Sequence, residues 1–147
     1  MIAVIIFSLA IVAFFFFSLN TTDEAGETID SLNYDAANIA NNLLSEGYPI
    51  CWNPDNVIRL GILSNSRINE TKLESFLYLS QTDYQRTKSL METTHNYYIT
   101  FSENITIGNQ TIEFVGNMSD NPQNLIKATR LATYRNKPLV IYIHAWD

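Results

Sequence analysis

The chain begins with an uninterrupted apolar segment, residues 1–19, whose sequence MIAVIIFSLAIVAFFFFSL contains no charged residue, proline or glycine. At a rise of 1.5 Å per residue, a helix of this length would extend roughly 28 Å, close to the hydrocarbon thickness of a bilayer. Because the segment is apolar on all sides, we expect it to be fully buried, either in a bilayer or in a bundle of identical neighbours. The side chains predicted to mediate this membrane or polymerisation contact are Ile5, Ile6, Phe7, Leu9, Ile11, Val12, Phe14, Phe15, Phe16, Phe17 and Leu19.

The hydrophobic pattern continues beyond residue 19 with helical spacing. Apolar residues from Ile29 to Leu44 recur at intervals of three and four, and Gly47 and Pro49 are typical of a helix end. Residues 20–26 are weak helix formers, so we expect a hinge there, at Thr21, Thr22 and Gly26. The predicted domains are an N-terminal helix over residues 1–46 (1–19 as membrane span or filament core, 20–46 as amphipathic extension) and a globular head over residues 47–147.

The head shows two short helical patterns and several strand patterns. Asn69 is expected to cap a helix over residues 70–80, and Thr82 or Asp83 a second helix that ends near Met91. Runs rich in β-branched and aromatic residues predict strands at 57–63, 97–101, 105–107, 111–115, 125–134 and 139–146, with hairpin turns at 108–109 and 135–138. The expected fold class is α+β: a long N-terminal hydrophobic helix followed by a small head with an antiparallel β-sheet and short helices.

Charge is distributed unevenly along the chain. Residues 20–46 contain six acidic residues and no basic one, which equals the whole formal charge of −6, whereas the head balances nine acids against nine bases. Because the sequence shows no basic cluster, nucleic acid is not expected as a partner. No lysine or arginine precedes Arg59, so both flanks of the apolar segment lack the basic residues that usually orient a membrane helix. We therefore expect that a basic leader once preceded Met1 and was removed.

The sequence offers little catalytic chemistry. It contains no nucleotide-binding, zinc-protease or paired-cysteine motif. Cys51, the only cysteine, is expected to be a small buried hydrophobe beside Trp52, and His95 and His144 are expected to be structural or surface residues. A single Asp120 is too little for a calcium site. We expect no enzyme activity, no metal and no cofactor. Candidate N-glycosylation sequons occur at Asn20, Asn69, Asn104, Asn109 and Asn117.

Taken together, the apolar N-terminus, its helical continuation through Leu44 and the small head rich in asparagine and threonine resemble a mature archaeal type IV pilin. The resemblance implies a basic leader removed by a prepilin peptidase and an assembly machinery. Bacterial type IV pilins usually carry Glu at the fifth mature position, where this chain has Ile5. The function it implies is that of the structural subunit of an extracellular filament, a helical homo-oligomer that serves surface adhesion and is inserted in the cell membrane before assembly.

Two other functions remain open at this point. The first is a single-pass, membrane-anchored binding module or minor pilin, which would give detergent-soluble monomers rather than a polymer that shear releases. The second is an exported enzyme, which would require Cys51 or His144 to line a pocket.

Overall fold

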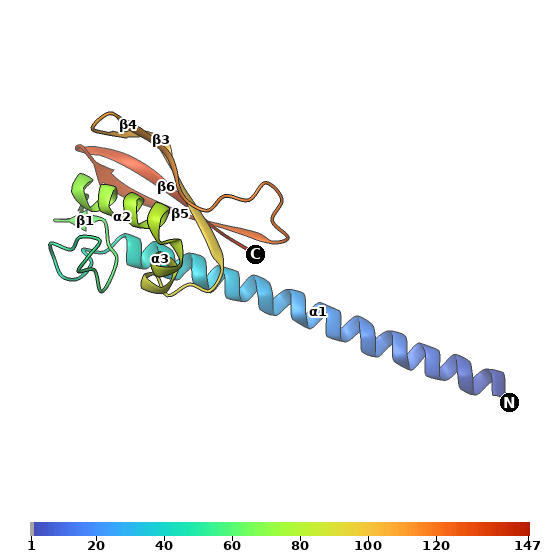
Figure 1. Ribbon diagram of the computed structural model, residues 1–147. Helices are drawn as coiled ribbons and strands as arrows, with labels where there is room; N and C mark the ends of the chain where they lie inside the picture. The colour runs from blue at the N-terminus through green and yellow to red at the C-terminus, as the bar shows by residue number, and fades with distance from the viewer. Residues whose placement is uncertain (1) are drawn as a thin grey trace. The chain divides into compact units, whose positions relative to one another are not determined.

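The computed structural model describes the backbone of residues 2–147 and the side chains of residues 7, 9–14 and 26–147. The chain divides into two compact units, Met1–Ser31 and Leu32–Asp147. Helix α1 (Ile2–Leu43) supplies the described part of the first unit and continues into the second. The second unit also contains strands β1–β6 and helices α2 and α3 (Figure 1).

The expected fold class, with a long hydrophobic helix as its leading element, is wrong. Among the residues that the structure describes, no helix is both long and apolar enough to cross a membrane. The described elements instead form a small mixed α+β domain, made mostly of two antiparallel sheets with short helices. The physical reason lies in the second half of α1, where exposed Glu27 and Asp30 are followed by buried Leu32 and Ile39. That half is amphipathic and packs along one side only.

The larger sheet has four antiparallel strands in the order β4-β3-β6-β5. Its strands are β3 (Asn96–Ile107), β4 (Gln110–Gly116), β5 (Leu125–Tyr134) and β6 (Lys137–Trp146). The predicted hairpin turns at 108–109 and 135–138 are confirmed, and β6 occupies a central position in the sheet. The runs at 97–101 and 105–107 belong to one strand, β3, whose pairing with β4 is interrupted by an irregularity between Thr100 and Ile105.

Helices α2 (Glu70–Thr82) and α3 (Tyr84–Leu90) begin where the sequence predicted. The Asn69 side chain accepts a hydrogen bond from the backbone N–H of Lys72, and the Asp83 side chain accepts one from that of Arg86. Each cap therefore satisfies a backbone donor that the first turn of a helix leaves unpaired. In the second half of α1, Leu32, Ala36, Ile39 and Leu43 are fully buried, as the apolar period indicated.

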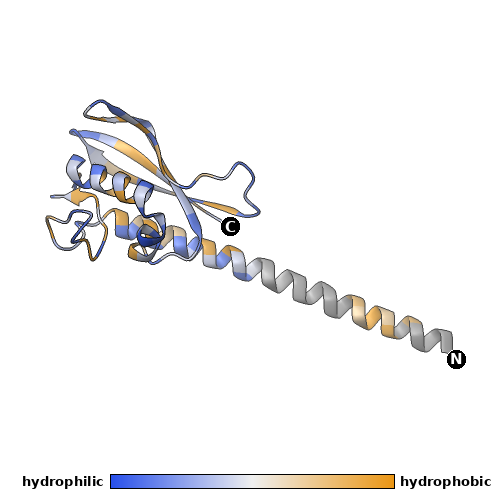
Figure 2. Ribbon diagram, viewed as in Figure 1, coloured by the Kyte–Doolittle hydropathy of each residue, from blue (hydrophilic) through white to orange (hydrophobic). Residues whose placement is uncertain are grey.

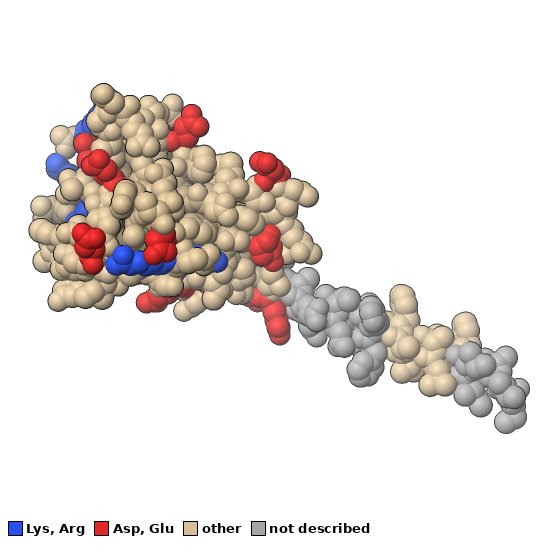
Figure 3. Space-filling model, viewed as in Figure 1, with Lys and Arg blue, Asp and Glu red and all other residues tan. Residues whose placement is uncertain are grey.

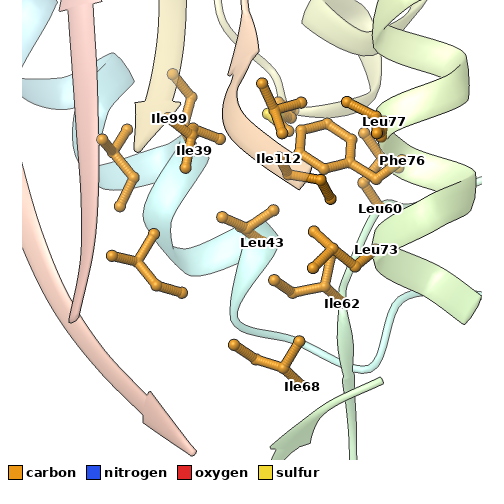
Figure 4. Close-up of a cluster of buried hydrophobic side chains, with 14 of the residues drawn as sticks. Ile39, Leu43, Leu60, Ile62, Ile68, Leu73, Phe76, Leu77, Ile99 and Ile112 are labelled. Atoms are coloured by element: carbon orange, nitrogen blue, oxygen red, sulfur yellow. The ribbon is translucent and has the colours of Figure 1, made fainter. Parts of the chain in front are cut away.

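The main core lies between one face of the large sheet and the helices. Figure 4 shows Ile39 and Leu43 of α1 and Phe76 of α2 among these buried side chains. On β6, Leu139, Ile141, Ile143 and Ala145 are buried, whereas the alternate residues Val140, Tyr142, His144 and Trp146 are only half-buried. This alternation places the second set on the opposite face of the sheet, which we call the outer face.

The prediction of a strand over 57–63 is wrong. The second sheet consists of only two short strands, β1 (Leu63–Ser64) and β2 (Arg67–Ile68), and residues before Leu63 form a loop in which Arg59 bridges to Tyr48. The apolar run is explained by burial, because Val57, Leu60 and Ile62 belong to the main core. A short apolar run cannot by itself distinguish a strand from a buried loop.

Buried side-chain hydrogen bonds fix this loop: one side chain comes from α2 and another from the loop itself. Lys72 is buried, and its Nζ donates hydrogen bonds to the carbonyl oxygens of Glu46 (2.7 Å) and Leu63 (2.8 Å). Lys72 therefore links the segment just beyond the C-terminus of α1, where the helix dipole favours a cation, to the first residue of β1. Trp52 is also buried, and its Nε1 donates to the carbonyl oxygen of Gly61 at 2.7 Å.

Candidate functional site

The first candidate surface is the part of α1 between Phe7 and Phe14, which is apolar around its whole circumference. Figure 2 shows it as an orange band on the helix. At about 100° per residue, its large side chains point in directions spread around the helix axis rather than along one stripe. Their exposed fractions are high: Phe7 69%, Leu9 64%, Ile11 42%, Val12 59% and Phe14 72%.

The other side chains of the predicted polymerisation set lie outside those that the structure describes. They are Ile5, Ile6, Phe15, Phe16, Phe17 and Leu19, and the same holds for the predicted hinge residues Thr21 and Thr22 and for the sequon residue Asn20. The backbone of the predicted hinge region is helical throughout, as part of α1. Gly26 is exposed, and a Cβ atom built on it would meet no atom within 4 Å. Bending there stays a prediction.

The second feature is a buried carboxylate that the sequence analysis did not single out. Asp35 of α1 is 5% exposed, and its Oδ2 is surrounded by donors from the residues immediately before β3. Thr93 Oγ1 donates at 2.8 Å, the backbone N–H groups of Thr94 and His95 at 2.9 and 3.1 Å, and Thr94 Oγ1 at 3.2 Å. The Nδ1 atom of His95 completes the set at 2.9 Å. We call Asp35, Thr93, Thr94 and His95 the Asp35 cluster.

The electrostatics of the Asp35 cluster favour the ionised carboxylate. Burial raises the pKa of Asp35, but the hydrogen bonds from His95, Thr93 and Thr94 outweigh that effect and hold the pKa below its ordinary value of 3.8. The hydrogen-bond partners of the His95 ring among the described side chains are Asp35 and Thr94. The role of the cluster is to fasten α1 to the start of β3.

A sequence signal for Asp35 does exist. Leu32, Asp35, Ala36 and Ile39 have the spacing i, i+3, i+4 and i+7, so Asp35 falls within the apolar stripe rather than on the polar face. A charged residue at a position with core spacing must find partners when it is buried. Its partner could not be identified from the sequence, because Thr93 and His95 lie about sixty residues further along.

A buried tyrosine pair lies near the same end of β3. The rings of Tyr84 and Tyr97 stack with their centroids 5.2 Å apart, and Tyr97 donates its hydroxyl to Thr87 Oγ1 at 2.8 Å. Burial raises the pKa of both phenols. Both hydroxyls therefore stay protonated and act as structural donors, and Tyr84 Oη also accepts the Tyr97 backbone N–H at 2.8 Å.

The outer face of the large sheet is a third candidate surface. The rings of Tyr98 and His144 stack at 4.2 Å with an interplanar angle of 5°, and Lys127 Nζ lies 3.9 Å above the Tyr142 ring. Burial and the neighbouring Lys127 charge lower the pKa of His144. Exposed apolar residues on the same face are Leu125, Leu131 and Phe114.

The residues that the sequence named for an enzyme or a metal site lie as follows in the described part of the chain. Among the described residues, no group of three histidine, cysteine or acidic side chains could hold a metal ion. The expectation that Cys51 is buried is wrong: the residue is exposed, because it lies in the loop outside the core that Trp52 enters. Cys51 lines a surface pocket together with Trp52 and Lys72, and His144 lies on β6 in the outer face. The enzyme hypothesis stays untested.

The sequon asparagines differ in how exposed their side chains are and in whether they form hydrogen bonds. Asn104, Asn109 and Asn117 are exposed, on β3, at the β3–β4 turn and directly after β4. Asn69 is half-buried, and its amide is engaged as the cap of α2, with Nδ2 also 3.4 Å from Ser64 Oγ. A glycan would fit the three exposed positions better than Asn69.

Charges on the surface form no large basic region on the face drawn in Figure 3, where acidic and basic side chains are both present. Two ion pairs occur among the described residues: His95 with Asp35, and Arg135 with Glu70. No family model matches the chain, and comparisons with curated proteins and with solved structures find no significant match.

Proposed function

We propose that the chain is the structural subunit of an extracellular filament, a homopolymer at the cell surface of the kind that the resemblance to archaeal type IV pilins implies. The observation that carries the proposal is the apolar surface of α1 between Phe7 and Phe14, exposed on all sides of the helix. Such surface is unfavourable in water by about 25 cal/mol per Å², so it needs a partner.

The distribution of these side chains favours a many-sided partner. A dimer would cover one stripe of the helix, as in a two-stranded coiled coil. Side chains that point in all directions around the axis are covered only when several neighbours surround the helix. Equivalent helices of other copies in a bundle provide this environment, and close packing between them supplies dispersion energy. Adhesion, and membrane insertion before assembly, remain part of the proposal.

The test is electron microscopy of material sheared from cells that express the chain. Leu9→Asp places a charge in the predicted bundle, where an unpaired carboxylate is strongly disfavoured, and should abolish filaments. Asn121→Asp makes the same change of charge at an exposed position of a polar loop and should leave filaments intact. Circular dichroism checks that both variants fold.

Normal filaments from Leu9→Asp would refute polymerisation through this surface. Detergent-soluble monomers from the unmodified chain, with no sheared polymer, would instead support the membrane-anchored binding module.

A further inference from the structure

The large sheet has two outermost strands, and each is unpaired on its outward side. Among the described residues, β4 pairs only with β3 and β5 pairs only with β6. Both strands belong to the second compact unit. An unpaired strand presents backbone N–H and C=O groups through which a strand of another chain can extend the sheet. We call these two unpaired sides the β4 edge and the β5 edge.

The position of a proline shows which backbone groups face the β5 edge. Pro138 lies opposite Thr133 in the ladder and has no N–H, so this pair cannot exchange two hydrogen bonds. Because hydrogen-bonded and non-hydrogen-bonded pairs alternate along an antiparallel ladder, Lys127 and Thr129 also belong to non-hydrogen-bonded pairs. Their N–H and C=O groups therefore point away from β6, toward the β5 edge.

The β4 edge is open as well. Asn117, directly after β4, donates its N–H to the carbonyl oxygen of Tyr97 at 2.8 Å. By the same alternation, the backbone groups of Phe114 and Gly116 point away from β3, and both residues lie in the regular part of the β3–β4 ladder. A surface groove of about 320 Å³, lined by all of β4 and by two residues of α2, runs beside this edge. Helix α2 therefore leaves room for an added strand.

The two edges belong to hairpins of opposite charge. Residues 96–116, which contain β3 and β4, include two acidic residues and no basic one, whereas residues 125–146, which contain β5 and β6, include four basic residues and no acidic one. Glu113 on β4 is exposed, and neither Glu113 nor Arg130 on β5 has an ion-pair partner among the described residues. Charge therefore favours contact between unlike edges over contact between like edges.

We propose that the β4 edge of one copy pairs with the β5 edge of a second copy, an inference that rests on the proposed function and specifies one of its contacts. All neighbouring strands in the order β4-β3-β6-β5 are antiparallel, so β4 and β5 run in opposite directions. Copies in the same orientation therefore meet as antiparallel strands. The contact is heterologous and leaves one edge unused at each end of the row, so it propagates into a polymer.

Charge also selects a register for this pairing. Placing Glu113 opposite Arg130 brings Phe114 opposite Thr129, and the latter two side chains both lie on the outer face. The ring of Phe114, which is 42% exposed in the single chain, would then meet Leu131 on the diagonal. Because the regular part of β4 is short, this ladder adds to the helix bundle of the filament and does not replace it.

The first experiment detects the contact by disulfide cross-linking of two full-length chains in mild detergent, both carrying Cys51→Ser and each with a different affinity tag. One chain carries Phe114→Cys and the other Thr129→Cys. Hydrogen-bonded antiparallel pairs have Cα atoms about 5.5 Å apart, within the range that a disulfide requires, so a mixed dimer should form. Asp55→Cys, at an exposed loop position outside the sheet, replaces Thr129→Cys in the control and should give little mixed dimer.

The second experiment tests the charges with the same cysteine pair. Glu113→Lys should lower the yield of mixed dimer about tenfold, because two cations then face each other. Arg130→Glu in the opposite chain should restore the yield, a rescue that a variant with a damaged fold could not show. The yield without charge substitutions should fall as salt rises.

The third experiment tests the backbone hydrogen bonds. Lys127→Gln and Lys127→Pro both remove the charge, but only Pro removes the N–H that faces the β5 edge, opposite Gly116 in the proposed register. Because this N–H does not bond to β6, Pro is compatible with the strand, and circular dichroism checks that both variants fold. The yield of mixed dimer with Lys127→Pro should be about threefold below that with Lys127→Gln.

The outcomes separate this inference from the proposed function. Filaments at the cell surface without selective cross-linking, or charge variants with unchanged yields, would overturn the contact and leave the filament proposal standing. Equal yields from Lys127→Pro and Lys127→Gln would overturn strand pairing. Equal cross-linking of Thr129→Cys and Asp55→Cys would show non-specific association and would also overturn the contact. Selective cross-linking with rescue but without filaments would support the contact and refute the filament.

Discussion

Replacing the buried carboxylate of Asp35 should strongly destabilise the fold. Asp35→Ala removes the acceptor of two backbone N–H groups and two threonine hydroxyls, and leaves Nδ1 of His95 without its partner. An unsatisfied buried donor costs about 1–3 kcal/mol, and several donors lose their acceptor here. Because some of these donors can rearrange around the smaller Ala side chain, the separate costs do not add fully. We expect a loss of about 3–5 kcal/mol in the free energy of unfolding.

The assay is urea unfolding of the full chain in mild detergent, followed by tryptophan fluorescence, to which Trp52 (3% exposed in the folded state) and half-buried Trp146 both contribute. Asp30→Ala is the matched control, because it removes the same charge from an exposed position of the same helix. It should change stability by no more than about 0.5 kcal/mol. If Asp35→Ala came within about 1 kcal/mol of Asp30→Ala, the hydrogen bonds to Asp35 would not stabilise the fold as argued.

The same carboxylate predicts a pH dependence with a definite sign. The pKa of Asp35 is lower in the folded state than its ordinary value of 3.8. Its contribution to the free energy of unfolding is therefore complete above pH 3.8 and is lost as the pH falls through the folded-state pKa. Glu70 also has a lowered pKa because of Arg135 and Tyr134. The difference between the unmodified chain and Asp35→Asn isolates the Asp35 contribution, and that difference should shrink below pH 3.8. A difference independent of pH there would contradict the assignment.

Two further predictions concern the loop that packs at the end of α1, and both use the same unfolding assay. Lys72→Met leaves two carbonyl groups without their buried donor and should cost about 2–4 kcal/mol, whereas the exposed control Lys137→Met should be nearly neutral. Gly61→Ala would place a Cβ atom 2.5 Å from the Ser45 carbonyl oxygen and should cost about 2–4 kcal/mol. Gly26→Ala, which meets no atom within 4 Å, should instead stabilise the helix by about 0.5–1 kcal/mol. Equal changes in stability for Lys72→Met and Lys137→Met, or for Gly61→Ala and Gly26→Ala, would contradict these explanations.

The parts of the fold that the sequence predicted correctly depend on local chemistry. Asn69 and Asp83 cap their helices through hydrogen bonds to residues three positions further on. The turn at Gly108, with φ of 59°, uses a backbone conformation that glycine adopts without strain. Signals of this kind involve neighbours in the sequence, so no tertiary information is needed to interpret them.

The errors arise where tertiary contacts decide the structure. Val57, Leu60 and Ile62 have strand-like composition, yet core burial and the Tyr48–Arg59 bridge hold them in a loop. The expectation of a long hydrophobic helix is also wrong, because no helix among the described residues is both long and apolar enough to cross a membrane. The Asp35 cluster needs partners from about sixty residues away, which no local pattern identifies.

A subunit that polymerises through its helix must transmit load from that helix to its own sheet. Apolar packing resists pulling the helix away from the sheet, but it resists sliding of the helix along the sheet only weakly. The reason is that apolar contacts are not directional. Hydrogen bonds are directional, and in the second unit they hold the helix at separate points. Asp35 accepts hydrogen bonds from the residues before β3, and Asn42 Nδ2 donates one to the carbonyl oxygen of Met91. If the filament proposal is correct, Asp35→Asn should therefore yield filaments that break at lower shear, even where it leaves the apolar surface at Phe7–Phe14 unchanged.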